Sequence, residues 1–398
     1  MIISCVRYQK FNYKRNRQSR QFDSIQQSTQ SITNKTISQN FPSNFKMSTS
    51  EYTETTAETV LLTGASGFIA VHILNQLFEL GYNIIGTVRS EEKGNWLARR
   101  FPGFKYEIVD LSPSEDGNDS PFTKVFKAHP EIKYVIHAAS PVSNYKENFY
   151  KNIFVPAVEG TKDILQAAHK YGPNIKKFVY TSSIAALINL GSNSEDQVFT
   201  EDSWNPISND SEELDKSWGN AYSASKTYSE RAVWEFKETV KPQFSVNTIL
   251  FPYVYGPPIH DVTYETLGSS IASAKQLIEL PKDTKEIPQL LPSNIDVRDV
   301  ARGHVQSLSN PEFDNTRSVL AANIADGQFI VDILHKHRPA EAADLAVGTP
   351  GVHNANFNRK YDFSKTNARL GFKFIPLEKT ILDLFDAVWQ LKKESEQK

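Results

Sequence analysis

The feature that most constrains this sequence is a run of small residues at the end of an apolar stretch. Residues 59–62 are followed at once by the run TGASGFIA, in which small residues recur at Gly64, Gly67 and Ala70. The first allows a tight turn, the second lets a pyrophosphate approach the backbone, and the third lets the following helix pack on a sheet. The N–H groups at a helix N-terminus favour an anion. The run predicts a phosphate cradle, with a simple tight turn as the alternative.

Apolar stretches alternate with helical ones as far as residue 250. The expected strands are residues 59–63, 82–86, 106–109, 133–138, 177–181 and 245–250. This alternation predicts an α/β fold, a doubly wound parallel Rossmann sheet with right-handed crossovers. Beyond residue 256 the alternation gives way to proline-punctuated loops and shorter helices. We expect a Rossmann domain with the catalytic residues over 58–256, and over 257–398 mainly a smaller C-terminal substrate-binding lobe with returning segments.

The composition excludes several classes of protein. The chain has 398 residues, of which 39% are hydrophobic, so it is long enough to bury a sizeable core. No stretch approaches the ~20 consecutive apolar residues that span a bilayer, which excludes a membrane span. The single cysteine, Cys5, leaves no disulfide, and the nine histidines lack metal-ligand spacing. We therefore expect no metal site.

The first residues differ in composition from the rest. Residues 1–46 carry eight Lys or Arg against one acid, a net +7, whereas the remaining residues carry 36 bases against 45 acids, a net -9. This polar segment lacks apolar periodicity, so residues 1–57 are expected to form a disordered extension. It is either a mitochondrial presequence or, as we favour, an upstream stretch before a start at Met47. We expect a cytoplasmic protein that binds no nucleic acid through its folded domain, which has no basic patch.

A tyrosine and a lysine four residues apart form a second constellation. Tyr222 and Lys226 fall in the helical stretch 221–238 and so share one helix face. A nearby ammonium favours the phenolate and lowers the phenol pKa from ~10, which suits proton exchange with an alcohol–carbonyl pair. A serine pair, Ser182 and Ser183, ends an expected strand, where ligands bind in open α/β sheets. Combined with the cradle, these residues indicate catalysis rather than a chance surface pair.

The second expected strand is followed by a cation. An acid there accepts from the 2′-hydroxyl of NAD, whereas a cation pairs with the 2′-phosphate of NADP. Here Arg89 comes first, Lys93 lies one turn further on, and the first acids are Glu91 and Glu92. The stretch predicts NADP(H), with an ordinary solvated arginine as the alternative.

The residues resemble one family, the extended short-chain dehydrogenase/reductases. The motifs that carry the resemblance are TGASGFIA at 63–70, HAASP at 137–141, TSS at 181–183, YSASK at 222–226, FPYVYGP at 251–257 and IDVRDVA at 295–301. Within the family the chain looks most similar to fungal NADPH-dependent methylglyoxal and aldehyde reductases, relatives of plant dihydroflavonol reductases. That closer likeness lies in EDSWNP at 201–206, NAY at 220–222 and LGFKF at 370–374.

The resemblance implies a role for each matching residue. Tyr222 would protonate a carbonyl oxygen, and Lys226 would bind the nicotinamide ribose and depress the tyrosine pKa. Ser183 would hold the same oxygen, although Ser182 stays open. The cofactor would be bound by Gly64, Ala65, Ser66, Gly67, Phe68 and Ile69 at the pyrophosphate, by Asp110 at the adenine, by Val254 and Ser270 beside the nicotinamide, and by Arg89, Lys93, Tyr222 and Lys226.

Together these patterns predict NADPH-dependent reduction of small aldehydes, ketones or dicarbonyls of the methylglyoxal type to alcohols, by a monomer or homodimer. A nucleotide-sugar epimerase or dehydratase of the same fold is an alternative, which Arg89 and Lys93 oppose. A catalytically silent NADPH-sensing protein is another, which the presence of serine, tyrosine and lysine together opposes. Residues 142–146 and 189–198 match no pattern and are expected to form substrate walls. The preferred carbonyl is therefore left open.

Overall fold

The alternating strands and helices form one central sheet in the computed structural model of this chain. The structure describes residues 58–110, 120–141, 145–189, 197–290, 293–353 and 360–397. The expected extension over residues 1–57 lies outside these ranges. So do residues 142–144 and 190–196 of the two expected substrate walls.

Among the described residues the central sheet has seven strands, and every neighbouring pair is parallel. The strands are β1 (Thr59–Thr63), β2 (Asn83–Val88), β3 (Lys105–Ile108), β4 (Ile132–His137), β5 (Lys177–Thr181), β7 (Ser245–Leu250) and β10 (Arg317–Val319). Their order is β10-β7-β5-β4-β1-β2-β3. The doubly wound parallel Rossmann sheet is confirmed, and β10 shows that a segment beyond residue 256 returns to it.

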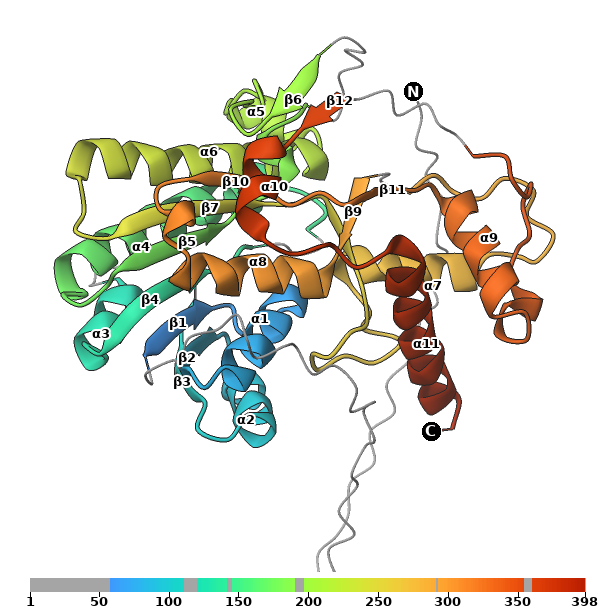
Figure 1. The fold of residues 1–398 in the computed structure, drawn as a ribbon, viewed down its shortest axis with the longest axis horizontal. Coiled ribbons are helices and arrows are strands. Elements are labelled where there is room, and N and C mark those ends of the chain that lie inside the picture. Colours follow the sequence, from blue (N-terminus) through green and yellow to red (C-terminus); the bar gives the residue numbers. More distant parts are fainter. Residues whose placement is uncertain are drawn as a thin grey trace, which may run out of the picture. The chain divides into compact units, whose positions relative to one another are not determined.

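Helices cover both faces of this sheet, so its central strands are apolar throughout. In β1, Val60 and Leu62 pack into one apolar cluster and Leu61 into the other. One face carries α1 (Phe68–Glu79), α2 (Glu91–Arg100) and α8 (Val297–Ser309), and the other carries α3 (Pro121–Ala128), α4 (Val155–Tyr171) and α6 (Trp218–Val240) (Figure 1).

Shorter elements complete the described chain. A second sheet has the order β11-β9-β8, from β8 (Tyr253–Tyr255), β9 (Ser293–Asp296) and β11 (Asn323–Ile324), and β6 (Val198–Thr200) pairs with β12 (Lys360–Asp362). The last helix, α11 (Leu377–Glu396), packs against α7 (Ala272–Ile278) and α9 (Gly327–His337) (Figure 1). The remaining helices are α5 (Ser211–Asp215), α10 (Ser364–Leu370), the π-helix η1 (Tyr150–Phe154) and the 3-10 helices η2 (Ile184–Ala186), η3 (Ser269–Ile271), η4 (Pro311–Phe313) and η5 (Glu341–Asp344).

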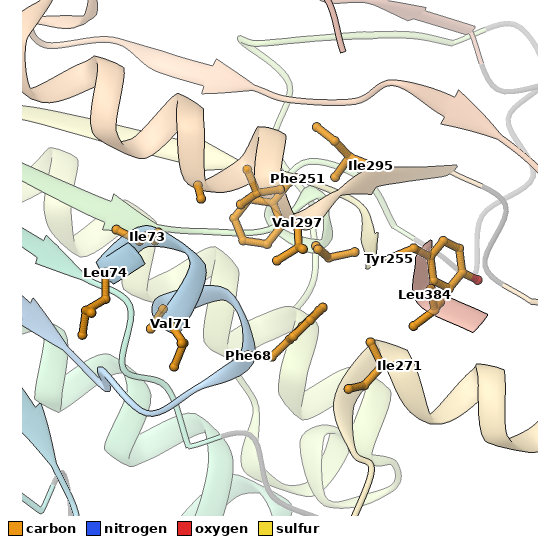
Figure 2. Close-up of a cluster of buried hydrophobic side chains, with 14 of the residues drawn as sticks. Phe68, Val71, Ile73, Leu74, Phe251, Tyr255, Ile271, Ile295, Val297 and Leu384 are labelled. Atoms are coloured by element: carbon orange, nitrogen blue, oxygen red, sulfur yellow. The ribbon is translucent and has the colours of Figure 1, made fainter. Parts of the chain in front are cut away.

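An apolar cluster anchors the helix that follows the predicted cradle. Figure 2 shows Phe68 and Val71 of α1 in the same buried group as Phe251, which follows β7, and Val297, which begins α8. Burying side chains of this size contributes about 1.5–3 kcal/mol each. The N-terminus of α1 therefore packs against segments that lie more than 180 residues away in the sequence.

In the ranges given above, no helix is both long and apolar enough to cross a membrane. The same residues contain no group of three or more His, Cys, Asp or Glu side chains placed to hold a metal ion.

Candidate active site

The turn after β1 requires glycine. Gly64 has a φ of +65°, and a Cβ there would lie 2.9 Å from the Cα of Ala139. The Gly64 N–H donates to the Thr87 hydroxyl at 3.2 Å, and the Ala65 N–H donates to the Thr87 carbonyl at 2.9 Å. The Gly67 N–H closes the turn on the Gly64 carbonyl at 3.0 Å. The turn is thus held between the ends of three adjacent strands, β4, β1 and β2.

Helix α1 begins without a side-chain cap. Its N-cap is Gly67, which is exposed and makes no side-chain cap hydrogen bond, and Ser66 beside it is half-buried. A Ser, Thr or Asp cap would satisfy the first N–H groups, whereas glycine leaves them to an anion. Phe68 is buried and Ile69 half-buried, so the two side chains anchor the turn to the apolar cluster beneath the sheet's first helix. These residues fit the pyrophosphate of a dinucleotide.

A hydrogen-bonded pair ties the cradle to β4. The Thr63 hydroxyl bonds to Nδ1 of the buried His137 at 2.8 Å and accepts the Ala139 N–H at 3.0 Å. Burial lowers the pKa of His137 to about 3, with the charge of Lys226 acting in the same direction, so the ring is neutral at ordinary pH. The ends of β1 and β4 are therefore locked together beside the cradle.

Ser183 and Tyr222 meet just beyond the end of β5. Ser183 is buried, and its hydroxyl caps η2 by accepting the Ala185 N–H at 3.2 Å. Tyr222 lies near the start of α6, where the Ser217 hydroxyl accepts the Asn220 N–H at 3.0 Å as the helix cap. Helix α6 packs against η2, and the Ser183 side chain acts to lower the pKa of the Tyr222 phenol, so the two side chains lie close together. The fold thus joins two of the three residues predicted to be catalytic.

Lys226 lies one turn further along α6 and is directed at β5. Its ammonium donates to the carbonyl of Thr181 at 3.2 Å and lies 5.9 Å from the centre of the Tyr180 ring. Only 6% of the residue is exposed. Burial lowers the pKa of Lys226 to about 8, and the negative charge of Glu230 opposes that fall. All three predicted catalytic residues therefore stand at the same end of β5.

The pKa of Tyr222 shifts in the direction opposite to the one predicted. Burial raises this pKa, and the neighbouring Ser183 side chain only partly opposes the rise. Lys226 was predicted to lower the pKa of Tyr222. In the chain without cofactor this pKa rises instead, because burial is the larger effect and the Lys226 ammonium is directed at the Thr181 carbonyl. A phenol that stays neutral at ordinary pH is ready to donate a proton.

Trp218, which the sequence analysis missed, stacks on Tyr222. The two rings are 5.0 Å apart between centroids with their planes at 7°. Both belong to α6 at i, i+4 spacing, which was the available signal.

The π-helix η1 follows Asn148, a non-glycine residue with a φ of +54°. π-helical turns and left-handed non-glycine residues are each found often at functional sites.

The residues predicted to meet the adenosine half lie on the surface. Arg89 directly follows β2 and Asp110 follows β3, and both are exposed at the same edge of neighbouring strands. Lys93 lies in the first turn of α2, with its ammonium 3.7 Å from the carboxylate of Asp261. Both side chains of that pair are 41% exposed. The structure thus brings these cations to the strand ends where the 2′-phosphate was expected.

Val254 and Ser270, predicted to flank the nicotinamide, are in direct contact. The Ser270 hydroxyl donates to the Val254 carbonyl, and the Ser273 hydroxyl donates to the Ser270 carbonyl at 2.6 Å. Val254 and Ser270 are both buried. The contact joins β8 to η3 across 16 residues of sequence.

A buried ion pair behind the catalytic residues also escaped the sequence analysis. Glu230 is fully buried in α6, and its carboxylate accepts from Arg317 of β10 at 2.7 Å. Glu230 carried a signal, since it stands four residues after Lys226 on one helix face. Arg317 carried none, because β10 has only three residues and no periodicity.

The fold and the site define an α/β protein with a parallel Rossmann sheet, a glycine turn after β1 and a Ser183–Tyr222–Lys226 group at the end of β5. The chain belongs to the NAD dependent epimerase/dehydratase family, which it matches over residues 60–322. The predicted membership of the extended short-chain dehydrogenase/reductases is thereby confirmed.

Two curated fungal proteins are similar over most of the chain. One is the putative NADPH-dependent methylglyoxal reductase GRP2 of Candida albicans, 36% identical over 82% of this chain and 96% of the relative. The other is the NADPH-dependent methylglyoxal reductase GRE2 of Saccharomyces cerevisiae, 35% identical over 81% of this chain and 96% of the relative. The crystal structure of yeast methylglyoxal/isovaleraldehyde reductase Gre2 with NADPH matches with a TM-score of 0.78 at 33% identity, over 84% of this chain and 99% of that one.

Proposed function

We propose that this protein reduces small aldehydes, ketones or dicarbonyls of the methylglyoxal type to alcohols, with Tyr222 as the general acid. NADP(H) as cofactor and an oxidoreductase acting on carbonyls agree with the names of the relatives and with the NADPH in the yeast structure. The observation that carries the finer proposal is the grouping of three side chains: Ser183 acts on the pKa of Tyr222, and Lys226 lies one turn from Tyr222 on the same helix.

The proposed reaction divides its steps among these residues. NADPH, when bound, supplies the hydride that adds to the carbonyl carbon. The Tyr222 hydroxyl gives its proton to the carbonyl oxygen, which leaves the alcohol and a tyrosinate. Because the Ser183 oxygen already accepts the Ala185 N–H, its own proton is available to donate to the same oxygen. Two donors then stabilise the negative charge that develops there.

The rest of the site would hold the cofactor. The uncapped turn at Gly67 would bind the pyrophosphate, and Arg89 with Lys93 would pair with the 2′-phosphate. Lys226 would contact the nicotinamide ribose, with its charge next to the tyrosinate that forms. Ser182 does not fit the role of the second donor, since its hydroxyl donates to Glu230 at 2.7 Å and faces the interior.

The test is NADPH oxidation with a panel of aldehydes, ketones and methylglyoxal, for the natural chain and Tyr222→Phe. We expect turnover to fall by roughly 100- to 10,000-fold with NADPH binding retained, as for loss of a general acid. Tyr228→Phe is the matched control, because Tyr228 lies on the same helix and its hydroxyl donates only to the Ile207 backbone at 3.3 Å. Near-full turnover in Tyr222→Phe would refute the mechanism. No turnover of any carbonyl by the natural chain would favour the epimerase or sensor alternatives.

A further inference from the structure

The inference concerns the buried carboxylate of Glu230 and rests on the proposed function. Four donors from four separate segments converge on it: Ser182 beyond β5 at 2.7 Å, Thr248 of β7 at 2.7 Å, Trp234 of α6 at 3.5 Å and Arg317 of β10 at 2.7 Å. No surface of Glu230 is exposed. A fully buried charge with every partner satisfied fixes the geometry of its surroundings more than it adds stability.

This carboxylate controls the backbone on both sides of Ser183. On one side it accepts the hydroxyl of Ser182, the residue directly before Ser183. On the other side its partner Arg317 donates to the carbonyl of Ala186, at the end of the short helix that Ser183 caps, at 3.4 Å. Ser183 is therefore held from both ends by one ion pair.

Arg317 also contacts a second segment, residues 201–204. Its guanidinium donates to the carbonyls of Glu201, at 2.8 Å, and Ser203. It also lies 3.9 Å from the centre of the Trp204 ring. The segment that follows one of the expected substrate walls is thus attached to the same pair.

Glu230 also faces Lys226, since the two residues are one helical turn apart on α6. Three further titratable groups lie near Lys226, namely Tyr222 on α6, Tyr180 on β5 and His137 on β4, and none of these is ionised at neutral pH. The positive charge of Arg317 is paired with Glu230 itself. Glu230 is therefore the negative charge in this group. Its charge opposes the fall in the Lys226 pKa that burial causes.

We propose that Glu230 is a positioning residue for the reduction, whose carboxylate aligns Ser183 through Ser182 and Arg317 and keeps the Lys226 side chain in its charged form. A purely structural role predicts lower stability alone. The positioning role predicts two further changes, in turnover and in the pH at which activity declines.

The test is the pH dependence of kcat/KM for carbonyl reduction in Glu230→Gln. We expect kcat to fall about tenfold or more, and the alkaline decline to move to lower pH by about one unit or more, because the opposite charge is removed. Glu230→Asp keeps the charge, so it should retain the midpoint of the natural chain. Glu235→Gln, which removes an exposed acid from the same helix, is the control and should change neither quantity.

Ser182→Ala separates alignment from charge, since it removes one hydrogen bond and leaves the ion pair intact. We expect a lower kcat with an unchanged midpoint and unchanged KM for NADPH. The proposal is overturned if Glu230→Gln matches Glu235→Gln in both quantities or, should Glu230→Gln fail to fold, if Ser182→Ala keeps the full kcat. Tyr222→Phe in the same assay distinguishes the failures: if it stays active the proposed function is wrong, and if it is inactive only the role of Glu230 is refuted.

Discussion

The proposed catalytic end of the site and the predicted adenosine end differ in how far their charged side chains are buried. At the catalytic end, Ser183 is 8% and Lys226 is 6% exposed, and the nearest acid, Glu230, is fully enclosed. At the adenosine end, Arg89 is exposed and Lys93 shares with Asp261 a contact in which both side chains are 41% exposed. One predicted cofactor would touch both ends.

This contrast separates chemistry from recognition. In the buried region a single charge changes the protonation of its neighbours, as Glu230 and Lys226 show. In the exposed region water and salt screen each charge, so one ionic contact with the cofactor adds only a modest amount to its binding affinity. Substitutions should therefore have large, pH-dependent effects at the first end and small, salt-dependent effects at the second.

The largest effect after loss of Tyr222 is expected at Lys226. Because burial lowers its pKa to about 8, the ammonium loses its proton above that pH, and NADPH should bind progressively more weakly from pH 8 upward. Lys226→Met should lower kcat/KM by roughly 100-fold and abolish this pH dependence. Fluorescence titration with NADPH across the pH range measures the change in NADPH binding. Lys237→Met, on the same helix at a half-buried position, is the control.

The same shift has a consequence for stability. The folded chain binds the Lys226 proton less tightly than the unfolded chain, whose lysine keeps the ordinary pKa of 10.5. This group therefore makes the free energy of unfolding rise between pH 8 and 10.5 in the absence of cofactor. If NADPH binding to the Lys226→Met variant still weakens above pH 8 as it does in the natural chain, another group titrates there.

An intermediate effect is expected at the exposed end. Arg89→Asp replaces the predicted partner of the 2′-phosphate by a repulsive charge, while NADH, which lacks that phosphate, should be used as well as before or better. Loss of one charge-assisted hydrogen bond at an exposed site should weaken NADPH binding about tenfold. Steady-state kinetics with both cofactors measure the ratio, and Arg99→Asp in the exposed part of α2 is the control. An unchanged NADPH preference would mark Arg89 as an ordinary surface charge.

The smallest effect is expected at Asp261, which holds the Lys93 ammonium at 3.7 Å. An exposed pair of this kind is worth ~0–1 kcal/mol. Asp261→Asn should release Lys93 and tighten NADPH binding about twofold at low salt, with the gain lost at high salt. Calorimetric titration at two salt concentrations, beside the exposed Asp283→Asn as control, measures it. If the natural chain and Asp261→Asn bind NADPH equally tightly at low salt, Lys93 does not leave Asp261 to bind the 2′-phosphate.

Most strands could be predicted because their apolar runs are local. Residues 59–63, 177–181 and 245–250 coincide with β1, β5 and β7. The second strand was predicted to end at Gly86 but continues to Val88, because that glycine lies inside the strand under the Phe104 ring, where a Cβ would come within 2.3 Å of the ring carbon. Position in the chain did not show that this glycine serves packing rather than a turn.

The sequence by itself determined six strands of the central sheet, the glycine turn and the helix that carries Tyr222 and Lys226, because each depends on spacing over a few residues. Only the tertiary structure decided that the Ser182 hydroxyl donates to Glu230 while Ser183 acts on Tyr222, in which direction the pKa of that tyrosine shifts, and that Glu230 meets Arg317. These features depend on distance and burial among segments far apart in the chain. Periodicity describes one segment at a time, whereas desolvation and ion pairing are set by whatever the fold packs against it.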